Sequence, residues 1–272
     1  MCYKFLCGVL KKIKPIVKKT YIKDKKIFET KESNIYLANC RSKKVILKEI
    51  KKSRYRKVEY VLGSAFKNEK RLCHINDMVK DYSDDTIAII LPYYKNGDLF
   101  EYVVKKGLPI SENETKAYIK QMLLCLQDFH KYNYVHLDVK LENFLIGNDG
   151  NLILSDFGLS QKFNNEYIFK NLNHRVGTNT YLSPEMYIYK KFNYKTDVWS
   201  IGVSTYILLT GNSLYKNIAD YNGSFHIDNI SNEANDFLKN TLSINKDRMT
   251  IDDSLNHPWI NDFYEDEVSI TI

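Results

Sequence analysis

One stretch of the chain, residues 134–158, constrains the fold more than any other. It reads YVHLDVKLENFLIGNDGNLILSDFG. Three polar residues, Asp138, Lys140 and Asn143, precede a short apolar run, and a turn leads into a second apolar run that ends at Asp156. Short apolar runs bounded by Gly, Asn and Asp predict strands. The stretch therefore predicts two short strands with acidic and amide side chains placed next to them.

The order of these residues resembles the catalytic loop and the metal-binding segment of protein kinases, usually written HRDxKxxN and DFG. A lone Asp-Phe-Gly tripeptide arises easily by chance, whereas both motifs in the correct order do not. The resemblance implies that Asp138 orients a substrate hydroxyl and accepts its proton, and that Lys140 neutralises the transferred phosphoryl group. It also implies that Asn143 and Asp156 hold Mg²⁺ through the oxygen ligands that this ion prefers.

A second signature lies in the N-terminal half of the chain. The sequence VILK at residues 45–48 resembles the VAIK strand, whose lysine holds the α- and β-phosphates of ATP, and this lysine is Lys48. Apolar residues spaced three or four apart predict a helix over Ser53–Leu72. In kinases a glutamate of this helix pairs with the strand lysine. Glu69 is the predicted partner, and Glu59 is the alternative. Neither glutamate lies at the usual distance from the HIN turn at 74–76.

The same resemblance predicts an adenine site between the two halves of the chain. Thr86–Leu91 predicts a buried strand ending at the gatekeeper position, and residues 92–94 would form the hinge under adenine. Ile46 stands where the family usually has alanine and would crowd the roof of the site. The predicted lining residues are Ile27, Ile35, Ile46, Leu91, Tyr94 and Leu145.

The phosphate-covering loop departs most from the family pattern. The three glycines of GxGxxG are replaced by Phe28, Thr30 and Ser33. Glycine lets backbone N–H groups approach phosphate and adopt positive φ, so side chains here hold the loop away from the nucleotide. Glu29 and Glu32 add negative charge near a polyanion. The loop therefore predicts weakened ATP binding.

The sequence GTNTYLSPE at 177–185 resembles the close of the activation segment in serine/threonine kinases. Thr178 matches the threonine that touches the catalytic aspartate and lysine. Leu137 replaces the arginine that reads a phosphorylated activation loop, which predicts activity that is independent of that phosphorylation. Two scaffold contacts are also predicted, one from Asp197 to backbone N–H groups of the catalytic loop and one between Arg248 and Glu185.

The resemblance covers residues 22–262 and implies an α+β, bilobal protein-kinase-like fold. Its small N-lobe would hold an antiparallel sheet and one helix, and its larger C-lobe would be mainly helical. The predicted divisions are a basic extension (1–20), a kinase domain (21–264) and a short tail (265–272), with the N-lobe at 21–92, the hinge at 92–95 and the C-lobe at 96–264. The clearest predicted helix is Ser111–His130, which a Ser111/Glu114 capping box begins. Residues 211–234 are shorter than the docking region of the family.

Composition adds expectations about partners and location. The net charge of +7 is concentrated near the start of the chain, which argues against a nucleic-acid surface. The six lysines of residues 1–20 form either a solvated arm or, beside acylated Cys2 or Cys7, a peripheral membrane contact. The five cysteines are widely spaced and lack a CxxC pair, which predicts reduced thiols in a cytoplasmic protein.

The predicted function is a serine/threonine protein kinase that uses ATP and Mg²⁺ and acts on a protein substrate. Its C-lobe, for example KQMLLCLQDFHKYNYVHLDVKLEN, resembles the calcium/calmodulin-dependent group. Glu142 and Asp98 match acidic positions that favour a basic residue upstream of the target hydroxyl. One alternative is a pseudokinase scaffold, which the missing glycines and Ile46 favour. The other alternative is a kinase-fold enzyme that phosphorylates small molecules. Thr178 and the Ser-Pro-Glu segment argue against it, because they resemble features of kinases that act on proteins.

Overall fold

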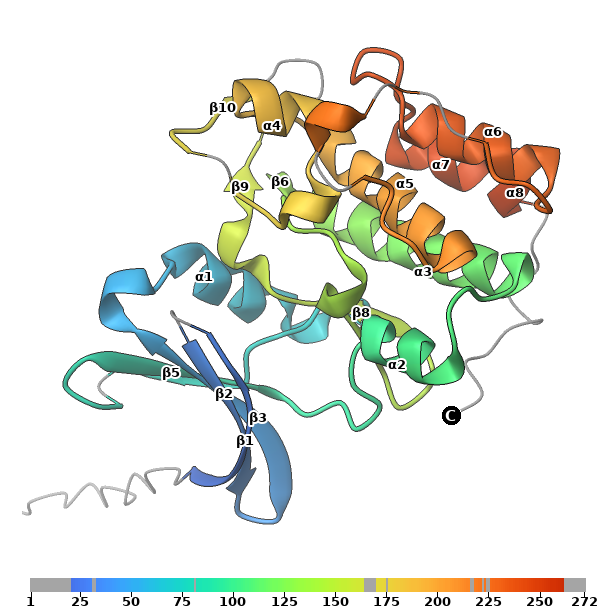
Figure 1. Cartoon of the computed structure of the whole chain (residues 1–272). Coiled ribbons are helices and arrows are strands. Elements are labelled where there is room, and N and C mark those ends of the chain that lie inside the picture. Colours follow the sequence, from blue (N-terminus) through green and yellow to red (C-terminus); the bar gives the residue numbers. More distant parts are fainter. Residues whose placement is uncertain are drawn as a thin grey trace, which may run out of the picture.

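The protein has two lobes of unequal size (Figure 1). The computed structural model describes residues 21–30, 33–80, 82–163, 170–174, 176–215, 218–221, 223 and 226–261. A five-stranded antiparallel sheet and one helix form the N-lobe, and the larger C-lobe is mainly helical. This confirms the predicted α+β bilobal fold. The predicted extension (1–20) and tail (265–272), with Cys2 and Cys7, lie outside the described residues.

The N-lobe sheet places one of its faces toward the C-lobe. Its strands are β1 (Ile22–Glu29), β2 (Ser33–Cys40), β3 (Lys43–Lys51), β4 (Asp77–Val79) and β5 (Thr86–Pro92), in the order β1-β2-β3-β5-β4. Ile35 lies opposite Lys48, and Ile46 lies opposite Leu91. Directly opposed residues point to the same face of a sheet. These four side chains therefore face the cleft, while Leu47 and its neighbours form the buried opposite face.

The helix of the N-lobe is shorter than predicted. It is α1 (Lys57–Ala65), which η1 (Lys52–Arg54) precedes and η2 (Phe66–Asn68) follows. A β-carbon at Gly63 would lie 2.6 Å from Ile75, and the Ile75 N–H donates to the Gly63 carbonyl at 2.9 Å. The returning chain therefore packs directly on the helix backbone, and the predicted span Ser53–Leu72 is wrong at both ends.

The C-lobe is built around two long helices, α3 (Glu112–His130) and α5 (Lys195–Thr210). Ser111 caps α3, because its hydroxyl accepts from the Glu114 N–H and donates to the Glu114 carboxylate, so the predicted helix start is confirmed. The remaining helices are α2 (Leu99–Lys106), α4 (Pro184–Tyr189), α6 (Asn232–Thr241), α7 (Ile251–Asn256) and α8 (Pro258–Asn261). The short strands are β6 (Tyr134–Val135), β7 (Phe144–Ile146), β8 (Leu152–Leu154), β9 (Gln161–Lys162), β10 (Lys170–Asn171) and β11 (Lys191–Phe192).

A buried ion pair joins α4 to the segment before α7. The Arg248 side chain is fully buried and donates two hydrogen bonds to the Glu185 carboxylate, at 2.7 and 3.0 Å. It also donates to the backbone carbonyls of Lys195 and Ser243. The predicted pair of Arg248 and Glu185 is therefore confirmed.

Among the described residues, no helix combines the length and the apolar character needed to cross a membrane. Cys40, Cys73 and Cys125 are free thiols.

Candidate active site

Strands β7 and β8 hold the polar residues of the central stretch in place. The two strands pair as an antiparallel hairpin. The short helix η3 (Leu141–Asn143) precedes β7, and η4 (Phe157–Leu159) follows β8. Asn143 therefore lies at the start of one strand and Asp156 just beyond the end of the other. The predicted pair of strands is confirmed.

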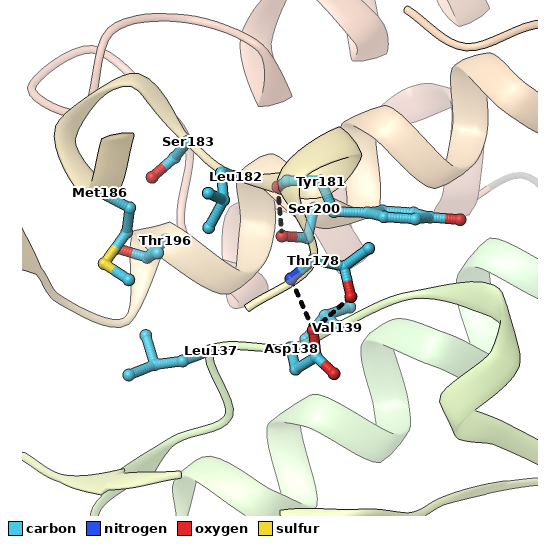
Figure 2. A pocket seen from close by; sticks show the side chains of 10 residues that line it. All are labelled: Leu137, Asp138, Val139, Thr178, Tyr181, Leu182, Ser183, Met186, Thr196 and Ser200. Atoms are coloured by element: carbon cyan, nitrogen blue, oxygen red, sulfur yellow. Dashed lines mark hydrogen bonds between the residues drawn. The ribbon is translucent and has the colours of Figure 1, made fainter. Parts of the chain in front are cut away.

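Asp138 is a buried carboxylate with polar neighbours on both oxygens. Its Oδ1 accepts from the Thr178 N–H at 2.9 Å and from the Thr178 hydroxyl at 2.8 Å, as Figure 2 shows. Its Oδ2 lies 3.0 Å from the Lys140 ammonium and 3.3 Å from the Asn143 amide nitrogen. Lys140 also donates to the Thr178 hydroxyl at 2.8 Å. The predicted contacts of Thr178 with Asp138 and Lys140 are confirmed.

Asp197 orders the backbone of the catalytic loop. Its carboxylate accepts from the backbone N–H groups of His136 at 2.8 Å and Leu137 at 2.9 Å, which confirms the prediction for this residue. Leu137 has φ of 66°, a left-handed conformation that non-glycine residues rarely adopt. The two hydrogen bonds to Asp197 hold the loop in this strained form, which presents Asp138 to the cleft.

Lys48 joins the two lobes across the cleft. Its ammonium donates to Glu59 at 2.7 Å and to Asp156 at 3.1 Å. Burial alone would lower the pKa of Lys48, but the two carboxylates outweigh burial and raise it. The Lys48 ammonium in turn lowers the pKa of Asp156, whose side chain is 47% exposed. The pKa of Glu59 is raised, because burial penalises its charged form more than the Lys48 ammonium favours it.

Glu69 is not the partner of Lys48, so the predicted pairing is wrong and the alternative, Glu59, is correct. Glu69 follows η2, and its carboxylate accepts from the Tyr132 hydroxyl at 2.6 Å. The long connection between Glu59 and the HIN turn misled the prediction, because α1 ends at Ala65 and the chain then turns onto the C-lobe. Glu69 is therefore also removed from the predicted nucleotide contacts.

Asn143 and Asp156 fit the role of metal ligands by their donor atoms. The Asn143 amide nitrogen donates to the Asp138 carbonyl at 2.7 Å, so this hydrogen bond does not occupy the amide oxygen. Asp156 uses only Oδ1 on Lys48. Hard oxygen donors of this kind suit Mg²⁺, which commonly takes one or two protein ligands together with substrate phosphates. No group of three or more His, Cys, Asp or Glu side chains that could hold a metal occurs in the described part of the chain.

The predicted adenine-lining residues lie on the N-lobe sheet, the hinge and β7, and all but one of those on the sheet follow its regular pairing. Ile35, Ile46 and Leu91 share the cleft face of the sheet, and Leu145 lies below in β7. The Tyr94 side chain packs into the C-lobe core beside Cys73, so its backbone is the part that would face adenine. Ile27 is the exception, because it falls at an irregularity of β1 between the paired residues Lys26 and Phe28 and is 51% exposed.

Thr30 and Ser33, on either side of the β1–β2 turn, hydrogen bond to each other. The Thr30 N–H donates to the Ser33 carbonyl at 2.8 Å, and the Ser33 N–H donates to the Thr30 hydroxyl at 2.9 Å. These N–H groups are those a glycine-rich loop would offer to phosphate. Phe28 lies opposite Ile35 on the cleft face of the sheet and was missed as a site residue. The two-residue alternation of β1 is interrupted just before Phe28, so only the strand register shows to which face of the sheet the Phe28 side chain points.

Leu137 lies in an apolar cluster beneath the activation segment. The side chain is 5% exposed. A β-carbon at Gly177 would lie 2.5 Å from the Leu137 carbonyl oxygen, so the two backbones touch. Figure 2 shows the adjoining small pocket between Leu137, Leu182 and Met186. The buried members of the cluster are Val135, Leu137, Phe163, Val176, Leu182, Met186 and Phe192. The sequence indicated only that the arginine was missing, and it carried no signal for this cluster.

Two short ladders add backbone anchors to the same segment. β9 pairs with β6, and β10 pairs with β11. The Leu172 N–H donates to the Lys190 carbonyl at 2.8 Å, and the Tyr194 hydroxyl donates to the Phe163 carbonyl at 2.7 Å.

Comparisons with known proteins agree with this geometry. The family model described as the protein kinase domain matches residues 21–260. Myosin light chain kinase 2, skeletal/cardiac muscle, from Mus musculus is 34% identical over 195 residues, which cover 66% of this chain and 31% of that protein. Death-associated protein kinase dapk-1 from Caenorhabditis elegans is 34% identical over 189 residues, which cover 64% of this chain and 13% of that protein. The chain therefore spans about a third or less of the length of these relatives.

Both relatives support the predicted likeness to the calcium/calmodulin-dependent group. The motifs, the bilobal fold and the family match agree. The chain belongs to the protein kinase family, among its serine/threonine members.

Proposed function

We propose that this chain is an active serine/threonine kinase that transfers the γ-phosphate of ATP to a protein hydroxyl. The observation that carries the proposal is the charged chain of contacts from Glu59 through Lys48 to Asp156, which spans the cleft. Taking a lysine and its carboxylate partners out of water costs free energy, even when the charges are paired. A scaffold that binds no nucleotide would gain nothing in return for this cost.

Asp138 would act on the substrate hydroxyl. Thr178 holds one oxygen of its carboxylate, and the other faces Lys140 and the cleft. This second oxygen, which Lys140 and the Asn143 amide contact, would accept the hydroxyl proton as the new bond to phosphorus forms and the bond between the γ-phosphorus and the ADP leaving group breaks. Lys140 then stabilises the negative charge of the transferred group. Mg²⁺, when bound by Asn143 and Asp156, would neutralise phosphate charge.

The proposed enzyme binds the ATP phosphates more weakly than a kinase with a glycine-rich loop. Thr30 and Ser33 use their N–H groups within the β1–β2 turn. Phosphate binding would therefore depend on Lys48 and on the metal ligands. We infer that ATP binds with a raised KM and that the enzyme is slow.

The proposed protein substrate carries a basic residue upstream of its target hydroxyl. Glu142 is exposed beside the catalytic loop, and Asp98 lies at the start of α2, where its Oδ1 accepts from the Glu101 N–H. The C-lobe, residues 96–264, holds 20 Asp and Glu against 16 Lys and Arg. An acidic C-lobe attracts a basic peptide over a long range.

The activation segment would need no phosphate to order it. In place of an arginine, Leu137 offers an apolar contact to Val176, Leu182 and Met186. Apolar burial is independent of modification. We infer that the described part of the segment, residues 176–185, keeps its position without phosphorylation.

Leu137→Arg is expected to destabilise the fold by about 3 kcal/mol, because the guanidinium would be buried without a partner. Activity toward a peptide should fall with it. Thermal unfolding and peptide phosphorylation measure both effects. Leu137→Met is the control, and it should cost less than about 1.5 kcal/mol because it conserves volume. An arginine variant that stays stable and becomes dependent on phosphorylation would contradict the inference.

The deciding experiment compares Mg²⁺-ATP binding and turnover on mixed basic peptides for the wild type and Asp156→Ala. We expect the wild type to bind and to transfer phosphate, and the variant to do neither measurably. If the wild type does not exceed the variant in either assay, the enzyme proposal fails and the pseudokinase alternative holds. If free small-molecule hydroxyls are phosphorylated better than peptides, the other alternative holds.

We also propose a cytoplasmic location, in which the six lysines of residues 1–20 allow contact with an anionic membrane. The proposal rests on sequence alone. Membrane partitioning of a Cys2/Cys7 double variant decides whether acylation contributes, and unchanged partitioning would exclude it.

A further inference from the structure

The connection between α1 and β4 is attached to the C-lobe rather than to its own lobe. Leu72 forms a parallel bridge with Leu154 of β8. The Cys73 N–H donates to the Leu154 carbonyl at 2.8 Å, and the Leu154 N–H donates to the Arg71 carbonyl at 2.9 Å. Residues 71–73 thus extend the β7–β8 hairpin, whose next residues lead to Asp156.

Phe66 fixes the beginning of the same connection. Its side chain is fully buried. Its ring lies 4.9 Å from the ring of Phe157 and 4.9 Å from the ring of Tyr132, both edge to face. Phe129 of α3 stacks on Phe157 at 5.3 Å. The end of α1 is therefore packed onto α3 and onto the residue that follows Asp156.

Two polar contacts reinforce this attachment. The Tyr132 hydroxyl donates to Glu69 Oε1 at 2.6 Å, a bond that raises the pKa of Tyr132 to about 12. The Arg71 guanidinium donates to Asp128 at 3.1 Å. Each contact joins the connection to α3 or to the residues just after it.

Helix α1 depends on its packing against other segments. It has nine residues, and no side chain caps its N-terminus. Its buried residues are Glu59, Leu62 and Gly63. An isolated helix of this length is unstable in water, so its position depends on its neighbours. Yet α1 carries Glu59, which must reach Lys48.

We propose that Glu69 and Tyr132 are positioning residues. Their hydrogen bond holds the end of α1 on the C-lobe, so that Glu59 stays paired with Lys48 and Lys48 stays aligned with Asp156. The functional consequence rests on the proposed kinase activity, whereas the effect on α1 does not. Glu69 thus acts on Lys48 indirectly, through the position of α1.

The structural test is hydrogen exchange of the α1 amides in Tyr132→Phe and Glu69→Ala, without nucleotide. We expect exchange to become about tenfold faster in both variants. The double variant should be no faster than either single one, because both remove the same bond. Glu69→Gln keeps an acceptor and should restore most of the protection. Tyr134→Phe is the matched control, since it removes a nearby hydroxyl outside this pair. Unchanged exchange in Tyr132→Phe and Glu69→Ala would overturn the proposal, even if melting temperatures fell.

The catalytic test separates positioning from simple loss of folded protein. Displacement of α1 should raise the KM for ATP about fivefold to tenfold and leave the KM for peptide unchanged. Loss of folded enzyme would lower kcat and leave both KM values unchanged, and that result would also overturn the proposal. If α1 exchange rises in the variants but the wild type transfers no phosphate, Glu69 and Tyr132 retain their role and the proposed function fails.

Discussion

Asp138→Asn is expected to lower kcat by about 10³-fold, which is the usual contribution of a positioned general base. The asparagine has nearly the same shape and keeps an acceptor for the Thr178 N–H and hydroxyl. It loses the charge that attracts Lys140 and the capacity to take a proton. Steady-state phosphorylation of a basic peptide measures the change. The KM for ATP should stay within about twofold, because Asp138 faces the hydroxyl rather than the nucleotide.

Asp247→Asn is the matched control for this variant. Asp247 is an exposed carboxylate of the C-lobe that makes none of the contacts described at the candidate site, so its replacement should leave kcat unchanged. An Asp138→Asn enzyme with wild-type kcat would show that another group accepts the proton. A fall in kcat that matched a loss of folded protein would assign Asp138 a structural role instead.

Glu185→Ala is expected to lower the free energy of unfolding by about 3–5 kcal/mol, because it leaves a buried charge without its partner. Arg248 has no exposed surface, and its guanidinium lies 4.9 Å from the centre of the Trp199 ring. The charge therefore cannot turn toward water. A domain of ordinary stability, about 5–15 kcal/mol, would lose a large part of it. Denaturant midpoints at neutral pH measure the loss.

Lys105→Ala is the control for an exposed ion pair. Lys105 and Glu101 lie 2.7 Å apart on α2, with side chains that are 72% and 57% exposed. Exposed pairs of this kind contribute about 0–1 kcal/mol. Equal losses in Glu185→Ala and Lys105→Ala would show that the buried pair contributes no more than a surface pair.

The same pair predicts a pH dependence of stability. Burial alone would raise the pKa of Glu185, but Arg248 outweighs burial and lowers it below the ordinary value of 4.5. A carboxyl whose pKa is lower in the folded state stabilises the fold above the unfolded pKa. That contribution is lost as the pH falls from about 4.5 through the folded pKa. The unfolding free energy of Glu185→Ala should therefore decline less steeply in acid than that of the wild type.

The motif residues of the central stretch were predictable because their spacing along a short segment of sequence is enough to place them near one another. Asp138, Asn143 and Asp156 follow from residues within one short hairpin, whose turn and apolar runs are visible in the sequence. Lys48 was predictable for the same reason, since it ends an apolar run in a strand. The caps at Ser111 and the pair of Arg248 and Glu185 also matched their expected places.

The partner of Lys48 was not predictable in this way. Helical periodicity continued through Phe66, but this side chain turns into the C-lobe and ends α1. Sequence spacing therefore predicts a helical position for Glu69, whereas α1 ends at Ala65, before Glu69. Only the packing of the connection on α3 decided between the two glutamates, because spacing along the chain carries no information about where a turn leads.

By itself, the sequence determined the family, the two lobes and the identity of the groups that would perform phosphoryl transfer. The tertiary structure decided which glutamate meets Lys48, where Phe28 points, and what surrounds Leu137. The physical reason is that motifs record local chemistry, whereas these three features depend on contacts between segments far apart in the chain. Such contacts follow from burial and register, which are properties of the whole fold.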